Sequence, residues 1–321
     1  MEPLVSVLTP CYNGEAYIDQ YAKSLLDQTY DNCQIIFMDD GSTDKTKEKI
    51  YKYIDEFRKK GFQFEYYYHE NCGLGATISE GIQYVKGDYL VWPDVDDIMS
   101  PDSIIKKVRF LREHPELGAV RTDNKKVNIN DLSVVLEYGA QKYPNRKKEV
   151  LFEDYLCGKN MWLQPGCYMI DMKKYAVANP DRYIFPTRTG QDWQILLPIL
   201  YKYKCGYLDE ALYTYIVREG SLSDQSKHTL QERYEKYQRY QEIIIQTIKH
   251  MQIETYEHYE KMVYVQYAER SIDMAYNERN KDIAKEAYTM LKRLKSSSFK
   301  YKLKVIFAES EFMHKITELK G

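Results

Sequence analysis

Short apolar runs alternate with helical segments through the first 125 residues, and this alternation restricts the possible folds more than any other feature of the chain. The apolar runs lie at residues 4–9, 34–38, 62–68 and 88–91, and the segments between them have the three- and four-residue apolar spacing of helices. Strands that alternate with helices in this way predict a parallel sheet with right-handed crossovers. We therefore expect an α/β fold with a Rossmann-like sheet that is mixed but mostly parallel.

Polar residues follow each of the four apolar runs. They are Thr9 and Tyr12, then Asp39 and Asp40, then Asn71, and finally Asp94 to Asp97. Because the carboxyl ends of parallel strands share one edge of a sheet, these side chains should converge on one crevice, where open α/β sheets bind ligands. Such a set suits a nucleotide diphosphate: Tyr12 would stack on the base, and Asp40 would accept a hydrogen bond from the base or the ribose.

The densest group of charges is the acidic segment Trp92-Pro93-Asp94-Val95-Asp96-Asp97. Three carboxylates this close repel one another, and a bound divalent cation relieves that repulsion. Hard oxygen ligands suit Mg²⁺ or Mn²⁺, which at Asp96 would offset the charge of a diphosphate. The alternative is a solvated acidic turn before a helix that Ser100 caps, with Pro101 in the first helical position.

Several classes of protein are disfavoured because their patterns are missing from the sequence. The turn after the first strand, Pro10-Cys11-Tyr12-Asn13-Gly14, is not a GxGxxG dinucleotide motif, and no GxxxxGK[ST] phosphate loop occurs. A net charge of −2 gives no global field for nucleic acid. No run of about 18 apolar residues predicts a membrane span, and the first residues do not resemble a secretory signal. Six cysteines without CxxC spacing fit free thiols in a reducing compartment, so we expect a cytoplasmic protein.

Five motifs follow one another in a diagnostic order. They are V-S-V-L-T-P-C-Y-N-G-E-A-Y-I, S-L-L-D-Q-T-Y, M-D-D-G-S-T-D, N-C-G-L-G-A-T and D-V-D-D-I-M-S-P. Together they resemble the family-2 inverting glycosyltransferases of the A-type fold, and the resemblance covers residues 4–225. It implies transfer of a sugar from a nucleotide-sugar, usually a UDP-sugar, to a hydroxyl of a glycan or lipid-linked glycan in the bacterial assembly of capsule, wall polymer or lipopolysaccharide. It also implies an Mn²⁺ or Mg²⁺ cofactor bound through the DxD motif.

The resemblance assigns the donor pocket to particular residues. The family stacks uracil on the position of Tyr12 and hydrogen-bonds it at the position of Asp40, while Thr9 and Pro10 line the same pocket. Many relatives carry Ala-Arg-Asn in the helix after the glycine loop, where this chain has Thr77-Ile78-Ser79. If that arginine normally meets the donor, another group must do so here, and the identity of the donor sugar is left open.

The resemblance also places the catalytic centre. Asp94 and Asp96 are the family's ribose- and metal-binding pair, and Asp97 either faces away or helps to order the acceptor side. Inverting transfer needs one general base, which removes the proton of the attacking hydroxyl, and the family's base falls on Asp192. The alternative for Asp192 is a helix N-cap. Trp193 either stacks on an acceptor sugar or belongs to the core.

The closing segment of the catalytic part departs from the family. Relatives often show Tyr-Arg-x-His there, with the histidine sometimes a metal ligand, and this chain places Arg218 at the histidine position. An arginine does not bind metal, but its guanidinium can bind phosphate through two hydrogen bonds. The open alternatives for Arg218 are a donor phosphate and a surface salt bridge.

We expect two domains. Residues 1–225 should form the catalytic domain, with a nucleotide-sugar half at 1–125 and an acceptor half at 115–225, and residues 226–321 should form an extension of three or four helices. The basic stretch 289–308 suggests peripheral contact with the inner face of the plasma membrane, near a lipid-linked acceptor. The alternatives are a basic helix on a soluble bundle and a homo-oligomer contact through the C-terminal helices.

Two other functions stay open at this point. A non-catalytic nucleotide-sugar-binding or scaffold protein would keep the fold without turnover, although a degenerate copy commonly loses one of the acids Asp94, Asp96 and Asp192. A nucleotidyltransferase shares the arrangement of acids at strand ends. Such enzymes usually carry a glycine-rich first loop with arginine and lysine, which residues 10–14 lack.

Overall fold

The computed structural model describes residues 2–162, 164–218 and 228–309. The chain divides into two compact units, Met1–Glu219 and Gly220–Gly321. The domain boundary expected at residue 225 lies outside the described residues.

The first unit begins with the expected parallel strands. These are β1 (Val5–Cys11), β2 (Cys33–Asp40), β3 (Gln63–His69) and β4 (Tyr89–Val91). Strand β1 pairs in parallel with β2 and with β4, and β2 pairs in parallel with β3. Every residue of β1, β2 and β4 is buried, which explains why these strands are continuous apolar runs rather than alternating ones.

The second half of the sheet brings antiparallel strands. These are β5 (Ile98–Met99), β6 (Leu117–Asn128), β7 (Asp131–Tyr138), β8 (Tyr168–Asp171) and β9 (Lys204–Val217). The nine described strands form one sheet in the order β3-β2-β1-β4-β8-β6-β9-β5, with β7 paired to β6. Strand β8 is antiparallel to both β4 and β6, whereas β6 and β9 run parallel. The predicted mixed α/β sheet is therefore confirmed.

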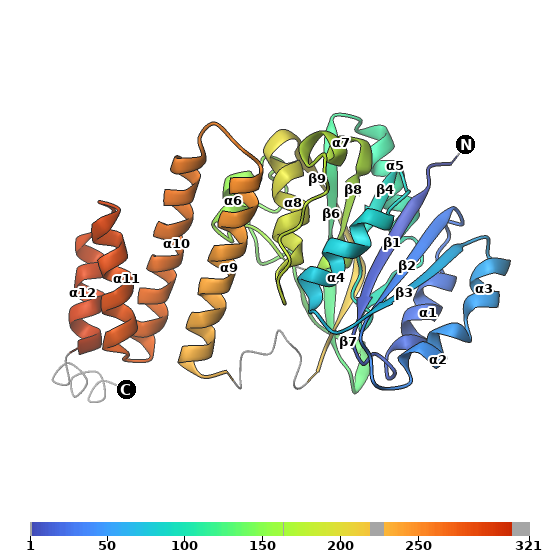
Figure 1. Ribbon diagram of the computed structural model, residues 1–321, viewed down its shortest axis with the longest axis horizontal. Helices are drawn as coiled ribbons and strands as arrows, with labels where there is room; N and C mark the ends of the chain where they lie inside the picture. Colours follow the sequence, from blue (N-terminus) through green and yellow to red (C-terminus); the bar gives the residue numbers. More distant parts are fainter. Residues whose placement is uncertain (1, 163, 219–227, 310–321) are drawn as a thin grey trace. The chain divides into compact units, whose positions relative to one another are not determined.

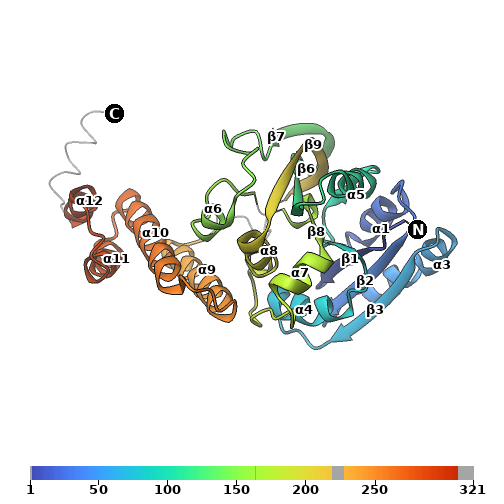
Figure 2. The same cartoon turned by 90° about the horizontal axis from the view of Figure 1, so that it is seen from above.

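Helices cover both faces of this sheet, as the view in Figure 2 shows. They are α1 (Ile18–Leu26), α2 (Thr46–Tyr51), α3 (Ile54–Lys59), α4 (Leu74–Gly81), the 3-10 turn η1 (Ile82–Tyr84), α5 (Ser103–Glu113), α6 (Phe152–Leu156), the 3-10 turn η2 (Pro165–Cys167), α7 (Met172–Ala178) and α8 (Gln191–Lys202). In Figure 2, α1 and α5 lie on one side of the sheet and α4 and α7 on the other. Coverage on both faces buries the parallel strands β1, β2 and β4, whereas β3 stays partly exposed.

The start of α5 corrects one prediction. Ser100 does not cap this helix, because Asp102 is the N-cap residue and the helix begins at Ser103. The backbone N–H of Ser100 donates to the Leu212 carbonyl at 3.0 Å, so Ser100 is still held by strand β9. The short strand β5 therefore delays the helix by two residues.

The second unit contains four described helices (Figure 1). They are α9 (Leu230–His250), α10 (Tyr256–Asn277), α11 (Lys281–Arg293) and α12 (Phe299–Glu309). Thr229 and Glu232 form a capping box at the start of α9. The helical character expected after residue 226 is confirmed for the described residues. None of the helices in the described ranges has both the length and the apolar character that a membrane crossing requires.

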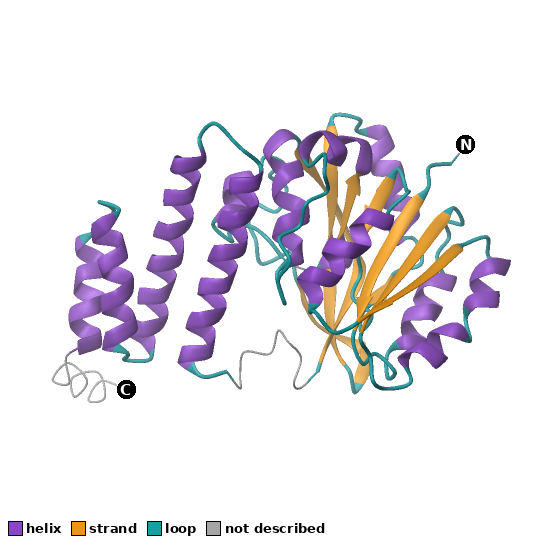
Figure 3. Cartoon of the chain, viewed as in Figure 1, coloured by secondary structure: helices purple, strands orange, loops and turns teal. Residues whose placement is uncertain are grey.

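The basic stretch 289–308 contributes to the core of this unit. Leu291, Tyr301, Val305 and Ala308 belong to one buried cluster with apolar residues of α9, α10 and α11. Lys304 also pairs with Asp273 of α10, with 2.6 Å between the ammonium nitrogen and a carboxylate oxygen. Much of the apolar surface of this stretch is therefore used inside the helical unit, as expected for a basic helix on a soluble bundle. Figure 3, coloured by secondary structure, shows that the described part of this unit contains helices and no strand.

Candidate active site

The carboxyl end of β1 carries the first group of expected donor residues. Thr9 is buried, and its hydroxyl oxygen accepts a hydrogen bond from the Tyr21 hydroxyl at 2.7 Å. Pro10 is also buried, whereas the Tyr12 side chain is 53% exposed. Asn13 links this end to the loop after β2, because its side-chain oxygen accepts from the Thr43 backbone N–H at 2.8 Å. The ring of Tyr12 is thus presented on a well-braced turn.

Asp40, at the end of β2, organises the loop that follows β3. Its carboxylate accepts backbone N–H bonds from Cys72 at 2.7 Å and from Gly73 at 3.0 Å. The ring nitrogen Nδ1 of His69 lies 3.5 Å from the same carboxylate. Asp40 is 4% exposed, so its burial is offset by these donors. Asp40 therefore braces the glycine loop from inside.

The glycine loop packs against the segment that leads to α8. A Cβ on Gly73 would lie 2.6 Å from the Arg188 Cα, and the backbone N–H of Ala76 donates to the Thr187 carbonyl at 2.9 Å. Gly73 has a φ of +91°, so the position favours glycine for its conformation as well as for space. The guanidinium of Arg188 donates to the side-chain oxygen of Asn71. Arg188 belongs to no motif of the sequence, because its position beside this loop depends on a contact between residues far apart in the chain.

The acidic cluster follows β4 as expected. One carboxylate oxygen from each of Asp94, Asp96 and Asp97 lies within 4.8 Å of the others. Burial raises the pKa of Asp94 well above its usual value, and the neighbouring charges of Asp96, Asp97 and Asp192 raise it further. Burial also raises the pKa of Asp97, followed by the effect of Asp96. The negative charges of these carboxylates therefore disfavour ionisation of their neighbours, as expected for mutual repulsion.

Asp97 ties the acidic cluster to strand β9. Its Oδ1 accepts the backbone N–H of Ile216 at 2.9 Å, while Oδ2 is buried and has no hydrogen-bond partner in the described part of the chain. Tyr213 of β9 supports the same turn, because its hydroxyl accepts the backbone N–H of Asp94 at 3.2 Å. Gly166 makes room for this arrangement, since a Cβ there would lie 2.0 Å from the Tyr213 ring.

Arg218 joins the cluster from the residue after β9. Its guanidinium donates to the Asp96 carboxylate, and its central carbon lies 4.2 Å from the centre of the Tyr17 ring. The second terminal nitrogen, Nη1, is buried without a hydrogen-bond partner among the described residues. The structure thus shows the salt bridge that was one of the two alternatives for Arg218.

Asp192 lies in the first turn of α8 and is not its N-cap, because Gly190 occupies that position. The indole Nε1–H of Trp92 donates to Asp192 Oδ1 at 2.9 Å. Burial raises the pKa of Asp192 to about 6, and the hydrogen bond from Trp92 opposes that rise. A buried carboxyl group with a pKa near neutrality has the properties of a general base or acid.

Trp193, the neighbour of Asp192, is placed differently. Its side chain is 5% exposed, and its indole N–H donates to the Tyr155 carbonyl at 3.0 Å. A sugar stacks on the open face of an aromatic ring, and burial leaves little of this ring open. The geometry favours the core alternative for Trp193.

Two groups of side chains bring three potential metal ligands close together. Asp94, Asp96 and Asp97 provide hard oxygen ligands, mutual repulsion and the unpartnered Oδ2 of Asp97, and this set fits Mg²⁺ or Mn²⁺. Asp40, His69 and Cys72 also bring three ligand atoms within 4.8 Å. However, the imidazole Nδ1 of His69 lies 2.8 Å from the Glu70 carbonyl oxygen, so a proton on that nitrogen already has an acceptor. The first group fits a divalent cation better.

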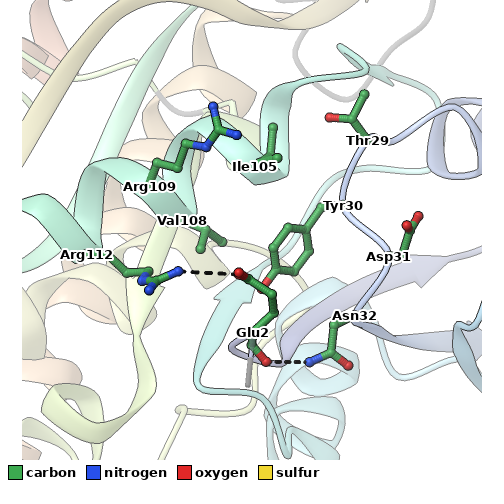
Figure 4. Close-up of a pocket in the computed structure, with 9 residues that line it drawn as sticks. All are labelled: Glu2, Thr29, Tyr30, Asp31, Asn32, Ile105, Val108, Arg109 and Arg112. Carbon is green, nitrogen blue, oxygen red and sulfur yellow. Dashed lines mark hydrogen bonds and ion pairs between the residues drawn. The ribbon is translucent and has the colours of Figure 1, made fainter.

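A separate cavity of about 320 Å³ lies at the amino ends of the strands (Figure 4). It is lined by Glu2, Thr29, Tyr30, Asp31, Asn32, Ile105, Val108, Arg109 and Arg112. Arg112 faces Glu2 with 3.4 Å between guanidinium and carboxylate, and the Asn32 side chain donates to the Glu2 carbonyl at 2.8 Å. None of the expected site residues lines this cavity.

Solved structures share the fold at low sequence identity. Residues 1–349 of TarS from S. aureus, solved in complex with UDP-GlcNAc, superpose with a TM-score of 0.62 at 18% identity, over 95% of this chain and 88% of that chain. The mannosyltransferase PcManGT from Pyrobaculum calidifontis, solved with GDP-Man and Mn²⁺, gives a TM-score of 0.57 at 14% identity, over 96% and 85%. At these identities the likeness establishes the fold alone.

Relatives that are similar in sequence are named glycosyltransferases. An uncharacterized glycosyltransferase of Rickettsia typhi is 37% identical over 127 residues, which is 40% of this chain and 35% of that protein. The putative glycosyltransferase EpsH of Bacillus subtilis is 32% identical over 162 residues, 49% of this chain and 44% of that protein. The matched region therefore spans less than half the length of these relatives. The model of "Glycosyl transferase family 2" matches residues 6–174, more than half of the sequence, and the chain belongs to this family.

Proposed function

We propose that the protein is a metal-dependent inverting glycosyltransferase that moves a sugar from a UDP-sugar to a hydroxyl of a glycan or lipid-linked glycan in the cytoplasm. The observation that carries this proposal is the position of Asp192. Asp192 is a buried carboxyl group with a pKa of about 6, and its negative charge contributes to the raised pKa of Asp94 in the acidic cluster. The nearness of this carboxyl group to a cluster that fits a divalent cation supports a role for Asp192 as the general base.

The donor would bind along the carboxyl ends of β1 to β4. In this proposal Tyr12 stacks on the base, Thr9 and Pro10 line the pocket, and Asp40 positions the base edge. The exposed ring of Tyr12 and the hydrogen bonds that fix Asp40 against the glycine loop support these roles. Thr77-Ile78-Ser79 lacks the arginine that many relatives carry, and we propose that Arg188, which contacts Asn71, supplies the positive charge.

Asp94 and Asp96 would hold the cation together with the ribose, and Asp97 would fix the turn through Ile216. The cation, when bound, neutralises charge on the departing diphosphate. Arg218 keeps a guanidinium next to Asp96, and its unpartnered Nη1 can meet a phosphate oxygen.

Asp192 would remove the proton of the acceptor hydroxyl while that oxygen attacks the anomeric carbon and the bond to the diphosphate breaks. Its Oδ1 accepts from Trp92, so Oδ2 is the oxygen that takes the proton. The new bond forms on the face opposite the leaving group, which inverts the anomeric configuration. Because the cation balances the leaving group, one protein carboxylate suffices.

A donor screen tests this proposal. UDP-, GDP-, CDP- and dTDP-sugars are incubated with the protein and Mn²⁺, Mg²⁺ or EDTA, and nucleotide release is followed. Slow release from one UDP-sugar that EDTA abolishes is the expected result. If no donor is hydrolysed, calorimetry with UDP and Mn²⁺ separates two cases: joint binding indicates that turnover requires the acceptor, and no binding supports a scaffold protein without a live donor site.

A further inference from the structure

Arg218 already neutralises part of the acidic cluster. Its terminal nitrogen Nη2 donates a hydrogen bond to Oδ2 of Asp96. The side chains of Arg218 and Asp96 are 22% and 29% exposed, so most of each side chain is out of contact with water. A partly buried, charge-assisted hydrogen bond is less screened and stronger than an ion pair on the open surface. The guanidinium is therefore a counter-ion of Asp96 that belongs to the chain itself.

The positive charge of Arg218 also acts on the other two carboxylates of the cluster. Burial and the neighbouring acids raise the pKa of Asp94 and of Asp97, and the charge of Arg218 opposes that rise in both. A bound divalent cation would relieve the same repulsion between the carboxylates. Arg218 and a divalent cation thus have the same electrostatic effect on this cluster.

Two contacts hold Arg218 beside the cluster independently of Asp96. The backbone N–H of Ile216, two residues earlier in the chain, donates to Asp97 Oδ1 at 2.9 Å. The central carbon of the guanidinium lies 4.2 Å from the centre of the Tyr17 ring, which is within the range of a cation–π contact. Because of these contacts, the guanidinium can release the Asp96 carboxylate through a change of side-chain torsions and still remain next to the cluster.

Arg218 and a divalent cation would compete for Asp96. Two positive groups on one carboxylate repel each other, and each weakens the attraction of the carboxylate for the other. The second terminal nitrogen of Arg218, Nη1, is buried and has no hydrogen-bond partner in the ranges that the structure describes. The guanidinium therefore has a donor that an anion could use, and a phosphate group can accept two hydrogen bonds from a guanidinium.

We propose that Arg218 exchanges Asp96 for the diphosphate of the donor when a divalent cation binds. In the metal-free protein Arg218 holds Asp96, and this contact weakens the binding of a cation alone. When the donor is present, its diphosphate accepts the guanidinium and Asp96 is released to the cation. This inference rests on the proposed function, and it adds the residue that couples the binding of the donor to the binding of the cation.

Binding measurements on the full chain test the exchange with two probes, Mn²⁺ and UDP. In Arg218→Gln, which removes the charge, Mn²⁺ alone should bind about tenfold more tightly than to the wild type, because Asp96 no longer has a competing partner. With UDP bound, Arg218 has already left Asp96 in the wild type, so the Mn²⁺ affinities of the two proteins should agree within about twofold. Coupling is reciprocal, and the increase in UDP affinity caused by Mn²⁺ should therefore be about tenfold smaller in the variant.

Two further variants serve as controls. Arg112→Gln also removes an arginine that faces a carboxylate, with 3.4 Å between Arg112 and Glu2, but it lines the separate cavity and should leave every affinity unchanged. Arg218→Lys keeps a positive charge beside Asp96 and should lie closer to the wild type than Arg218→Gln does. Free Mn²⁺ is measured by electron paramagnetic resonance, and UDP binding is measured by calorimetry with and without Mn²⁺.

Three outcomes would overturn the exchange. Unchanged or weaker binding of Mn²⁺ alone by Arg218→Gln would show that Arg218 does not compete for Asp96. An equal gain in Mn²⁺ affinity with and without UDP would show simple repulsion, with Arg218 in the same place in both states. Absence of joint binding of UDP and Mn²⁺ by the wild type would overturn the proposed function together with the exchange, whereas the first two outcomes leave joint binding intact, so the two failures are distinguishable.

Discussion

Trp92 and Asp192 are separated by 100 residues in the chain and joined by a hydrogen bond of 2.9 Å from the indole Nε1 to the carboxylate Oδ1. This bond connects the segment after β4, which carries the acidic cluster, to the first turn of α8. Trp92 is 1% exposed, so the donor is fixed by packing. The bond satisfies the buried indole N–H, orients the carboxylate and stabilises its charged form.

The pKa of Asp192 predicts the pH dependence of activity. A general base must be deprotonated, so with a pKa of about 6 we expect kcat/KM to fall as the pH drops through 6. Trp92→Phe removes the hydrogen bond that lowers this pKa, and the acid limb should move up by about one unit. The measurement is the pH profile of kcat/KM for both proteins.

A matched control for this variant is Trp162→Phe. Trp162 is also a buried tryptophan, and its indole N–H donates to the Thr122 carbonyl at 2.8 Å rather than to a carboxylate. Both variants should lose packing, but the acid limb should stay in place in Trp162→Phe. An acid limb that moves equally in the two variants would show that the hydrogen bond to Asp192 does not set the profile.

The same raised pKa predicts a stability effect. The folded-state pKa of about 6 lies above the ordinary value of 3.8, so ionisation of Asp192 destabilises the fold, and the loss grows as the pH rises from about 4 to above 6. Asp192→Asn removes this cost and should increase the free energy of unfolding by up to about 3 kcal/mol at pH 7 to 8, with no gain near pH 4. Denaturant unfolding at both pH values checks this. Asp55→Asn, at a side chain with 84% exposure, should show no such pH-dependent gain.

Removal of the Asp96 carboxylate should weaken metal-dependent donor binding. In Asp96→Ala we expect at least a tenfold lower affinity for UDP in the presence of Mn²⁺, because the cation loses a ligand and Arg218 loses its partner. Asp88→Ala, at the amino end of β4, is the control and should bind normally. Calorimetry with and without Mn²⁺ measures the effect, and an unchanged Mn²⁺ dependence in Asp96→Ala would contradict the metal assignment.

Arg188 provides a test of the donor loop. Arg188→Ala should raise KM for the donor about tenfold or more, because a charge-assisted contact is lost, whereas Arg188→Lys should retain part of the affinity. Tyr183 is an exposed residue outside the loop, and the control variant Tyr183→Phe should keep the KM of the wild type for the donor. If Arg188→Ala binds the donor as tightly as the wild type does, Arg188 does not replace the arginine that many relatives carry in the helix after the glycine loop.

Much of the fold could be predicted from the sequence because the parallel strands β1, β2 and β4 are buried on both faces. Burial of β1 and β2 favours apolar side chains at most positions, which makes the middle of each strand visible as an apolar run. Their ends stand out for the opposite reason, since Asp39 and Asp40 follow Met38, and the acids after β4 follow Trp92 and Pro93. The sharing of one sheet edge by those ends then follows from parallel pairing.

The remaining features depend on contacts between distant residues that no local pattern reveals. The hydrogen bond from Trp92 to Asp192 joins the segment after β4 to the first turn of α8, and the two residues are 100 positions apart in the sequence. The pairing of Arg218 with Asp96 depends on where β9 ends. The N-cap lies at Asp102 rather than at Ser100, whose backbone N–H is hydrogen-bonded to β9. Among the described strands β7 pairs with β6 alone, and its residues are exposed.

The most direct test of the central claim compares two measurements on Asp192→Asn. Asparagine keeps an oxygen that can accept the hydrogen bond from the Trp92 N–H, but at neutral pH it cannot take the proton of the acceptor hydroxyl. We predict that sugar transfer falls by two to four orders of magnitude, on the order of 10²–10⁴-fold, while calorimetry shows nearly unchanged binding of UDP with Mn²⁺. Near-normal transfer by this variant would remove Asp192 from the role of general base.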